Sequence, residues 1–333
     1  MDACTYLTPS TMSEQMLNRL DGRTLRIPDL WPLLKDWPRG RHAGYFSFKA
    51  MVEQGLECLG REKRNLIAAA EPDLLAAEFW PESRGKEVGL LLFYVIWQGY
   101  LDELLESLQN ADQAVADAFR HGICDFVDGA LDLGPPKKTI GDDDILTLFT
   151  QIADALKKRC PRDSLRRLSS AVRAYVYSTA EEYRLNRAGT VLSYEDYFAL
   201  RKKTGGTAPL VALAEYAART PLPESITMSQ AWLHVSDAVC VIVGLTNDLL
   251  SFKKEIYCNS TLNAIATISH DDPYMSLDKV VARIIRDIAS AVERVEEGEA
   301  QLLREASDPD EADDIRKVIR ILKLNSTGNL SWR

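Results

Sequence analysis

The sequence lacks the features that nucleic-acid-binding, zinc-binding and disulfide-rich proteins need. Its formal net charge of −9 provides no basic surface for a polyanion, so we expect no nucleic-acid partner. Only four histidines are present, and they are scattered, without zinc-ligand spacing. The six cysteines form no CxxC pair. We therefore interpret them as reduced thiols in a reducing, cytoplasmic compartment.

Membrane and export signals are also missing from the sequence as it stands. The first residues, MDACTY, contain no basic region followed by an apolar run, so we predict no signal peptide. No uninterrupted apolar run approaches the roughly 18 residues that predict a transmembrane helix. We therefore expect no membrane partner.

Alternating strand patterns and internal repeats are absent as well, whereas helical patterns are frequent. The sequence predicts one all-α domain over residues 1–333, in which prolines make residues 1–45 an irregular wrapping segment. Residues 134–144 are interpreted as a loop, and Asp142, Asp143 and Asp144 as caps of the helix that follows. The predicted helices cover residues 51–59, 73–80, 87–108, 113–132, 145–158, 163–188, 193–201, 210–218, 228–257, 276–306 and 310–324.

The stretch NDLLSFKKE at residues 247–255 carries the most specific chemical signal. Asn247, Ser251 and Glu255 recur every four positions, so they share one face of a helix. An amide oxygen, a hydroxyl and a carboxylate are hard donors that suit Mg²⁺, and Lys254 is placed to meet a phosphate. By spacing alone, an amphipathic helix with its polar face in water is the alternative.

This stretch resembles the second metal-binding motif of class I terpene synthases, N-D-x-x-S-x-x-x-E, with every defining position filled. The resemblance implies a class I isoprenoid synthase α-bundle, Mg²⁺ as cofactor and an isoprenoid diphosphate as substrate. In that family the metal ions trigger departure of diphosphate and leave an allylic cation in an apolar cavity.

A second segment, RKKTGG at residues 201–206, resembles the family's diphosphate-sensing segment and lies 46 residues before Asn247. On that resemblance Arg201 is the sensor, Thr204 the linker and Gly205 the effector, whose backbone carbonyl faces the substrate. The alternative is a plain helix C-terminus, where Arg and Gly are favoured by the helix dipole and the left-handed cap.

The first aspartate-rich motif departs from the family pattern. After the aromatic run FYVIW at residues 93–97, Gln98 and Gly99 stand where the two leading aspartates belong, and only Asp102 remains as a metal ligand. This implies fewer metal ions, or weaker binding. The alternative is that Asp102, Glu103 and Glu106 form a solvated helix end.

The last residues, GNLSW at 328–332, resemble the segment that precedes the family's Arg-Tyr pair, but only Arg333 follows. Either Arg333 substitutes for the pair, or that diphosphate contact is absent, or the sequence is truncated before the pair. Aromatic rings stabilise cations by about 0.5–2 kcal/mol each. We predict that Phe93 and Trp97 line the substrate pocket, together with Gln98, and that Tyr100, Trp232 and Trp332 also shape it, whereas Phe79 belongs to the core.

These observations leave three hypotheses. The leading one is an enzyme that ionises an isoprenoid diphosphate and cyclises the cation or traps it with a non-isoprenoid amine or hydroxyl. The second is metal-independent rearrangement or cycloaddition of a preformed terpenoid in the same cavity. The third is a non-catalytic terpenoid-binding protein. Chain length, product, second nucleophile and a homodimeric state stay open.

Overall fold

The computed structural model describes residues 11–55, 61–84, 86–108, 111–136, 144–258 and 260–332. Within these ranges the chain is helical and contains no strand, which confirms the predicted all-α class. Asp142, Asp143, Arg333, Cys4 and Cys58 lie outside the described residues. The described cysteines are free thiols.

The first half of the chain contains mostly short helices, with α5 and α6 the longest. They are α1 (Met12–Leu20), the 3₁₀ helix η1 (Trp31–Leu34), α2 (Tyr45–Gly55), α3 (Arg61–Ala69), α4 (Pro72–Phe79), α5 (Lys86–Ser107), α6 (Gln113–Ala130), α7 (Asp144–Thr147) and α8 (Phe149–Lys157).

The second half contains the four longest helices of the described chain. Its elements are α9 (Arg162–Ala188), α10 (Tyr194–Thr204), α11 (Thr207–Ala218), α12 (Glu224–Thr227), α13 (Gln230–Tyr257), α14 (Ala264–Asp271), α15 (Leu277–Glu305) and α16 (Pro309–Trp332).

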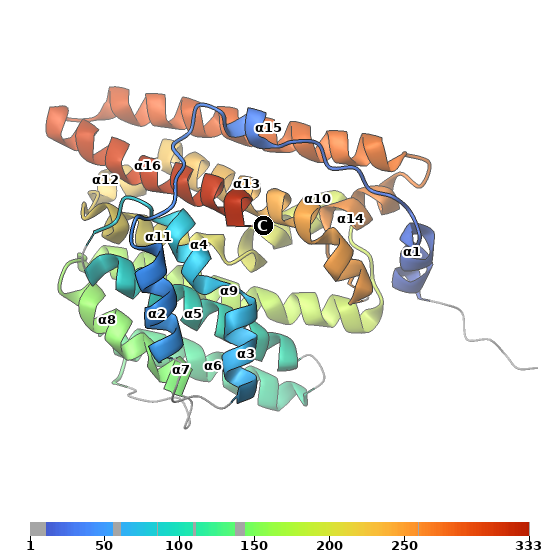
Figure 1. Ribbon diagram of the computed structural model, residues 1–333, viewed down its shortest axis with the longest axis horizontal. Coiled ribbons are helices and arrows are strands. Elements are labelled where there is room, and N and C mark those ends of the chain that lie inside the picture. Colours follow the sequence, from blue (N-terminus) through green and yellow to red (C-terminus); the bar gives the residue numbers. More distant parts are fainter. Residues whose placement is uncertain are drawn as a thin grey trace, which may run out of the picture.

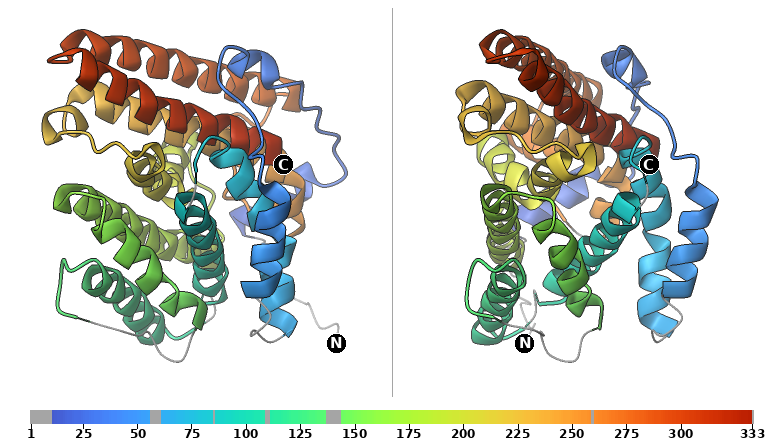
Figure 2. Two further views of the ribbon diagram at one scale, coloured as in Figure 1. Left: turned by 60° about the vertical axis from the view of Figure 1, so that its left-hand side comes forward. Right: turned by 90° about the vertical axis from the view of Figure 1, so that its left-hand side faces the viewer.

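Helix α13 is the centre of the bundle. It packs most extensively against α15 and also against α16, α11, α14 and α10. Figure 1 shows α15 and α16 side by side along one edge, with α6 and α8 at the opposite edge, and Figure 2 shows the same layers from two other directions. A helix enclosed on several sides must be apolar around most of its circumference, which is the composition of residues 238–245.

Two helices, Glu87–Ser107 and Gln230–Tyr257, are long and apolar enough to cross a membrane by length and composition alone. Counting uninterrupted apolar runs in the sequence missed this property. The most apolar windows of these helices are 56% and 78% buried inside the protein. The buried core helices of a globular protein have the same composition, so composition does not distinguish a core helix from a membrane-spanning one.

The N-terminal segment differs from its prediction as an irregular stretch. Residues 12–20 form α1, because Thr11 and Glu14 make a capping box: the Thr11 hydroxyl accepts from the Glu14 amide, and the Glu14 carboxylate accepts from the Thr11 amide. The chain then runs along α15 as an extended segment interrupted by η1 (Figure 1). At the end of this segment, Trp37 Nε1 donates to Glu296 Oε1 of α15 at 2.5 Å, which holds the segment against α15.

The C-terminal helix is longer than predicted, ending at Trp332 rather than near residue 324. Gly328 lets α16 pass close to α4, since a Cβ at this position would lie 2.6 Å from the Glu78 carbonyl oxygen. Asn329 Nδ2 donates to the Val243 carbonyl of α13 at 3.3 Å. The GNLSW segment therefore anchors α16 to α4 and α13.

Candidate active site

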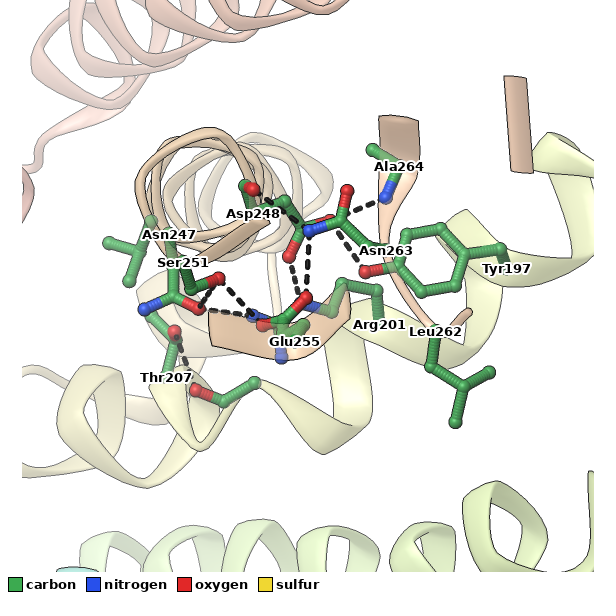
Figure 3. Close-up of polar contacts among 12 residues, drawn as sticks. Tyr197, Arg201, Thr207, Asn247, Asp248, Ser251, Glu255, Leu262, Asn263 and Ala264 are labelled. Atoms are coloured by element: carbon green, nitrogen blue, oxygen red, sulfur yellow. Dashed lines mark hydrogen bonds and ion pairs between the residues drawn. The ribbon is translucent and has the colours of Figure 1, made fainter. Parts of the chain in front are cut away.

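The three side chains of the predicted metal-binding face lie next to one another on α13. Ser251 Oγ donates to Glu255 Oε1 at 2.6 Å and lies 3.5 Å from Asn247 Oδ1, so the three oxygens form a continuous row (Figure 3). The second Glu255 oxygen, Oε2, accepts from Asn263 Nδ2 at 2.7 Å. The spacing of four residues thus aligns the three side chains as the sequence indicates.

Asp248 lies behind this face and organises it from the interior. Its side chain is fully buried and accepts from Tyr197 Oη at 2.5 Å, Arg201 Nε at 2.8 Å and the Ala264 amide at 3.1 Å. These donors come from α10 and from the start of α14, so one carboxylate joins three helices. A buried carboxylate requires such compensation.

Arg201 connects the interior to the metal-binding face. While Nε bonds to Asp248, a terminal nitrogen donates to Asn247 Oδ1 at 2.8 Å, and the aliphatic stem packs against Gly244. Burial lowers the pKa of the guanidinium, but the neighbouring charges of Asp248, Tyr197 and Glu255 outweigh burial and raise the pKa overall. Arg201 therefore stays cationic beside the site.

The carboxyl of Glu255 has a raised pKa. Burial is the largest cause and the negative charge of Asp248 adds to it, whereas Arg201 and the hydrogen bonds from Ser251 and Asn263 oppose it. Lys254 is exposed and borders the cavity, next to the triad on the same helix. The row of Asn247, Ser251 and Glu255 thus has one partly desolvated carboxylate, and the cations Arg201 and Lys254 lie beside it.

The helix break predicted after Arg201 is present. Helix α10 ends at Thr204 and α11 begins at Thr207, with Gly205 in right-handed and Gly206 in left-handed conformation, at φ +67°. The left-handed glycine is the N-cap of α11 rather than a residue directly after α10. Thr204, Gly205 and Gly206 all border the cavity.

The opposite wall comes from α5. Gln98 Nε2 donates to the Gly206 carbonyl at 2.8 Å, while a Cβ on Gly99 would meet no atom within 4 Å. Tyr175 Oη of α9 donates to Asp102 Oδ1. Desolvation raises the pKa of the Asp102 carboxyl; the bond from Tyr175 and the charges of Arg201 and Lys254 oppose the rise only in part.

A cavity of about 640 Å³ lies between these walls. Its polar end includes Gln98, Asp102, Arg201, Asn247 and Lys254. Its apolar wall consists of aliphatic and aromatic side chains from α3, α4, α5, α11, α13 and α16: Ile67, Leu75, Phe79, Val95, Ile96, Tyr100, Leu210, Val243 and Trp332. A polar end on an apolar chamber of this size is typical of a site for an amphiphilic small molecule.

The aromatic predictions are partly corrected. Tyr100 and Trp332 border the cavity, and so does Phe79, which is also part of the hydrophobic core as predicted. The cavity lining does not include Phe93, Trp97 or Trp232. Trp97 instead stacks on Phe149 at a centroid distance of 4.6 Å and donates Nε1 to the Leu146 carbonyl at 3.2 Å. On α5 the residues Val95, Ile96 and Gly99 face the cavity, so Trp97 points to the other side of the helix.

Sequence reasoning missed Glu182 on α9. Burial raises the pKa of its carboxyl to about 7, and the hydroxyl of Thr204 and the charge of Arg201 only limit the rise. Nothing in the local sequence distinguishes Glu182 from the adjacent Glu181, which pairs with Arg184 at the surface. Only the packing of α9 against α10 brings Glu182 beside the helix break.

The donor set fits a hard divalent cation at Asn247, Ser251 and Glu255. Three oxygens of different types converge, one carries a charge, and the Ser251 proton can rotate away to free a lone pair. No group of three or more His, Cys, Asp or Glu side chains suited to a metal occurs in the described chain. The site therefore relies on amide and hydroxyl oxygens beside a single carboxylate.

Comparison with known proteins agrees with this geometry. The family described as terpene synthase family 2, C-terminal metal binding, matches residues 93–294. Sesquiterpene cyclase hepA of Aspergillus oryzae is 21% identical, covering 94% of this chain and 88% of its own. Terpene cyclase braA of Annulohypoxylon truncatum is also 21% identical, covering 95% and 86%.

Solved structures share the fold. Hedycaryol synthase in complex with HEPES superposes with a TM-score of 0.76 at 18% identity, over 93% of this chain and 98% of its own. The linalool/nerolidol synthase of Streptomyces clavuligerus also gives 0.76, at 16% identity, over 93% and 99%.

The bundle is thus the class I terpene synthase fold. Because the family match spans residues 93–294, more than half of the sequence, the chain belongs to terpene synthase family 2, whose defining C-terminal domain binds metal.

Proposed function

We propose that this chain is a Mg²⁺-dependent enzyme that ionises an isoprenoid diphosphate, after which the cation is cyclised or trapped by a non-isoprenoid amine or hydroxyl. One observation carries the proposal. The cations Arg201 and Lys254 and the first oxygen donor of the row, Asn247, border one cavity that also has an apolar wall, and the row continues from Asn247 through Ser251 to Glu255. This arrangement matches a ligand with an anionic head and a hydrocarbon tail.

The diphosphate head would lie between α13 and the helix break. Asn247, Ser251 and Glu255 would hold Mg²⁺, which neutralises charge on the leaving group when bound. Arg201 keeps its Nε on Asp248, so its terminal nitrogen can move from Asn247 Oδ1 to a phosphate oxygen without the guanidinium losing its anchor. Lys254 adds a mobile point charge from the adjacent turn.

In the reaction the allylic carbon–oxygen bond breaks and both of its electrons leave with the diphosphate. The side chains of Leu75, Phe79, Val95 and Leu210 exclude water from the cation, and the rings of Tyr100 and Trp332 border the same space. In cyclisation a carbon–carbon π bond of the substrate supplies the next electron pair. In trapping, the lone pair of an amine nitrogen or hydroxyl oxygen supplies it.

The α5 wall supports trapping by a second substrate. It retains Asp102 at the edge of the cavity and has the neutral Gln98 and the open space at Gly99 in place of two carboxylates. When a nitrogen or oxygen nucleophile bonds to the cation, it must lose a proton. Asp102, whose pKa is raised, is the nearby base that accepts it.

Product analysis tests the proposal. The protein is incubated with C10, C15 and C20 diphosphates, with and without Mg²⁺, and with and without added amines; Glu255→Gln is the matched variant. We expect diphosphate release and terpenoid or conjugate products only with Mg²⁺ and only with the unaltered Glu255.

Conversion that is independent of Mg²⁺ and of Glu255 would instead favour metal-independent rearrangement or cycloaddition. Tight binding of terpenoids without conversion of any diphosphate would favour a binding protein. A product that contains the added amine would select trapping over cyclisation.

A further inference from the structure

The helix break beside the substrate cavity is bonded directly to the opposite wall. The backbone carbonyl of Gly206 accepts a hydrogen bond from Gln98 Nε2 at 2.8 Å, and the two residues are 108 positions apart in the sequence. A Cβ on Gly206 would lie 2.4 Å from that same nitrogen. Glycine is therefore required here twice, for its left-handed φ of +67° and for the close approach of the amide.

The bond fixes the orientation of the Gln98 amide. If the amide were flipped, Oε1 would face the Gly206 carbonyl oxygen, and two acceptors would repel each other. The observed orientation leaves Oε1 buried without a hydrogen-bond partner in the described structure. The Gln98 amide therefore binds Gly206 through its N–H donor. An ionised aspartate or glutamate side chain has no such donor.

We propose that Gln98 is a positioning residue that holds the α10–α11 break against α5 through a direct hydrogen bond. An ionised carboxylate at this position has no donor, so it could connect α5 to the Gly206 carbonyl only through a bound cation. The inference rests on the proposed function, in which Arg201 and Gly205 flank the diphosphate. Gln98 thereby sets the position of the break before any ligand binds, and Gly205 follows because it is the adjacent residue.

Neighbouring contacts show how the position is transmitted. The Gly205 amide donates to the Arg201 carbonyl at 2.9 Å, so displacement of the break also moves the last turn of α10. Arg201 is held at its other end by Asp248. A loosened break therefore changes the distance between Gly205 and the guanidinium, both of which border the cavity.

The first test measures amide hydrogen exchange in the ligand-free protein at residues 205–211. Gln98→Met keeps the length of the side chain and removes the donor, and we expect at least tenfold faster exchange there. Gly99→Asp is the matched control on the next residue, since its new side chain has open space and leaves the bond intact. Unchanged protection in Gln98→Met would overturn the proposal.

Gln98→Glu adds a pH-dependent arm. The introduced carboxyl accepts but does not donate when ionised, whereas its protonated form can donate to Gly206. We expect protection factors at residues 205–211 to be low at pH 8 and to recover toward those of the unaltered protein at pH 5. Equal protection at both pH values, or the same recovery in Gln98→Met, would contradict a role for the donor.

Steady-state kinetics distinguish positioning from general stability. With an accepted diphosphate and Mg²⁺, Gln98→Met should lower kcat about tenfold with KM changed less than twofold. A fall in stability alone would lower the active fraction and leave exchange at the break unaltered in the folded protein. If no diphosphate is converted but exchange responds as expected, the proposed function fails and the positioning role stands.

Discussion

The two helices that face each other across the cavity have opposite designs. Helix α13 presents three oxygen donors in a row, with Asp248 and Arg201 supporting them from behind. Helix α5 presents Gln98, which is bonded to Gly206, Gly99, which has open space beside it, and Asp102, which is bonded to Tyr175. In the proposed function, α13 and Arg201 of α10 supply the ionising half of the site, while α5 is free for other contacts. Four predictions test it.

The largest effect is expected for the only carboxylate of the row. Glu255→Gln removes the charge from the metal-binding face and should weaken Mg²⁺–pyrophosphate binding by roughly 100-fold or more. Isothermal titration calorimetry measures this directly. Glu103→Gln on the α5 wall is the matched control and should change affinity only a few-fold. Equal losses in both variants would erase the contrast between the walls.

Arg201→Ala should reduce both ligand binding and stability. The sequence assigns this charge to a ligand, whereas the ion pair with the fully buried Asp248 predicts that Arg201 also supports the fold. Loss of the partner leaves a buried carboxylate with fewer donors, which we expect to cost about 2–4 kcal/mol in unfolding free energy.

Denaturant unfolding measures this cost. Lys202→Ala, which breaks the more exposed pair with Asp237, should cost less than about 1 kcal/mol. If Arg201→Ala and Lys202→Ala unfold alike, Arg201 does not support α13 from behind.

Glu182→Gln should change the pH dependence of stability. The pKa of this carboxyl is about 7 in the folded protein and 4.5 as its ordinary value, so the folded state holds the proton more tightly. Stability is therefore highest at low pH with respect to this group and falls as pH rises from about 4.5 through 7. We expect the substitution to flatten this fall by about 1–3 kcal/mol.

Unfolding free energies at pH 5, 6, 7 and 8 check the sign. Glu181→Gln on the surface is the matched control, because its carboxyl has a lowered pKa caused chiefly by the bond to Arg184. A steeper fall in Glu182→Gln than in the unaltered protein would contradict the assignment.

The smallest change in affinity is expected when carboxylates are introduced on α5. Gly99→Asp adds a carboxylate where there is space, and we expect a few-fold gain in Mg²⁺-dependent pyrophosphate affinity. Gln98→Asp removes the donor to Gly206 and should give no gain. Calorimetry on the two single variants and the double variant shows which applies; a gain from Gln98→Asp alone would mean that position 98 is only a lost ligand.

Local pattern was sufficient for much of this protein. The residues of NDLLSFKKE aligned on one helix face as the spacing indicates, because i and i+4 side chains stack wherever a helix forms. The break after Arg201 was likewise predictable, since two consecutive glycines end a helix. The roles assigned to these residues stay predictions.

Tertiary structure decided what each position faces. Trp97 and Phe79 are both aromatic and helical, yet the first packs on Phe149 and the second borders the cavity, because the rotation of α5 and α4 against their neighbours sets the direction of each side chain. The commitment of Gln98 to Gly206 and the raised pKa of Glu182 depend on contacts between helices far apart in sequence. Sequence fixes which groups a helix carries and in what order, whereas burial and partners arise only when the helices pack.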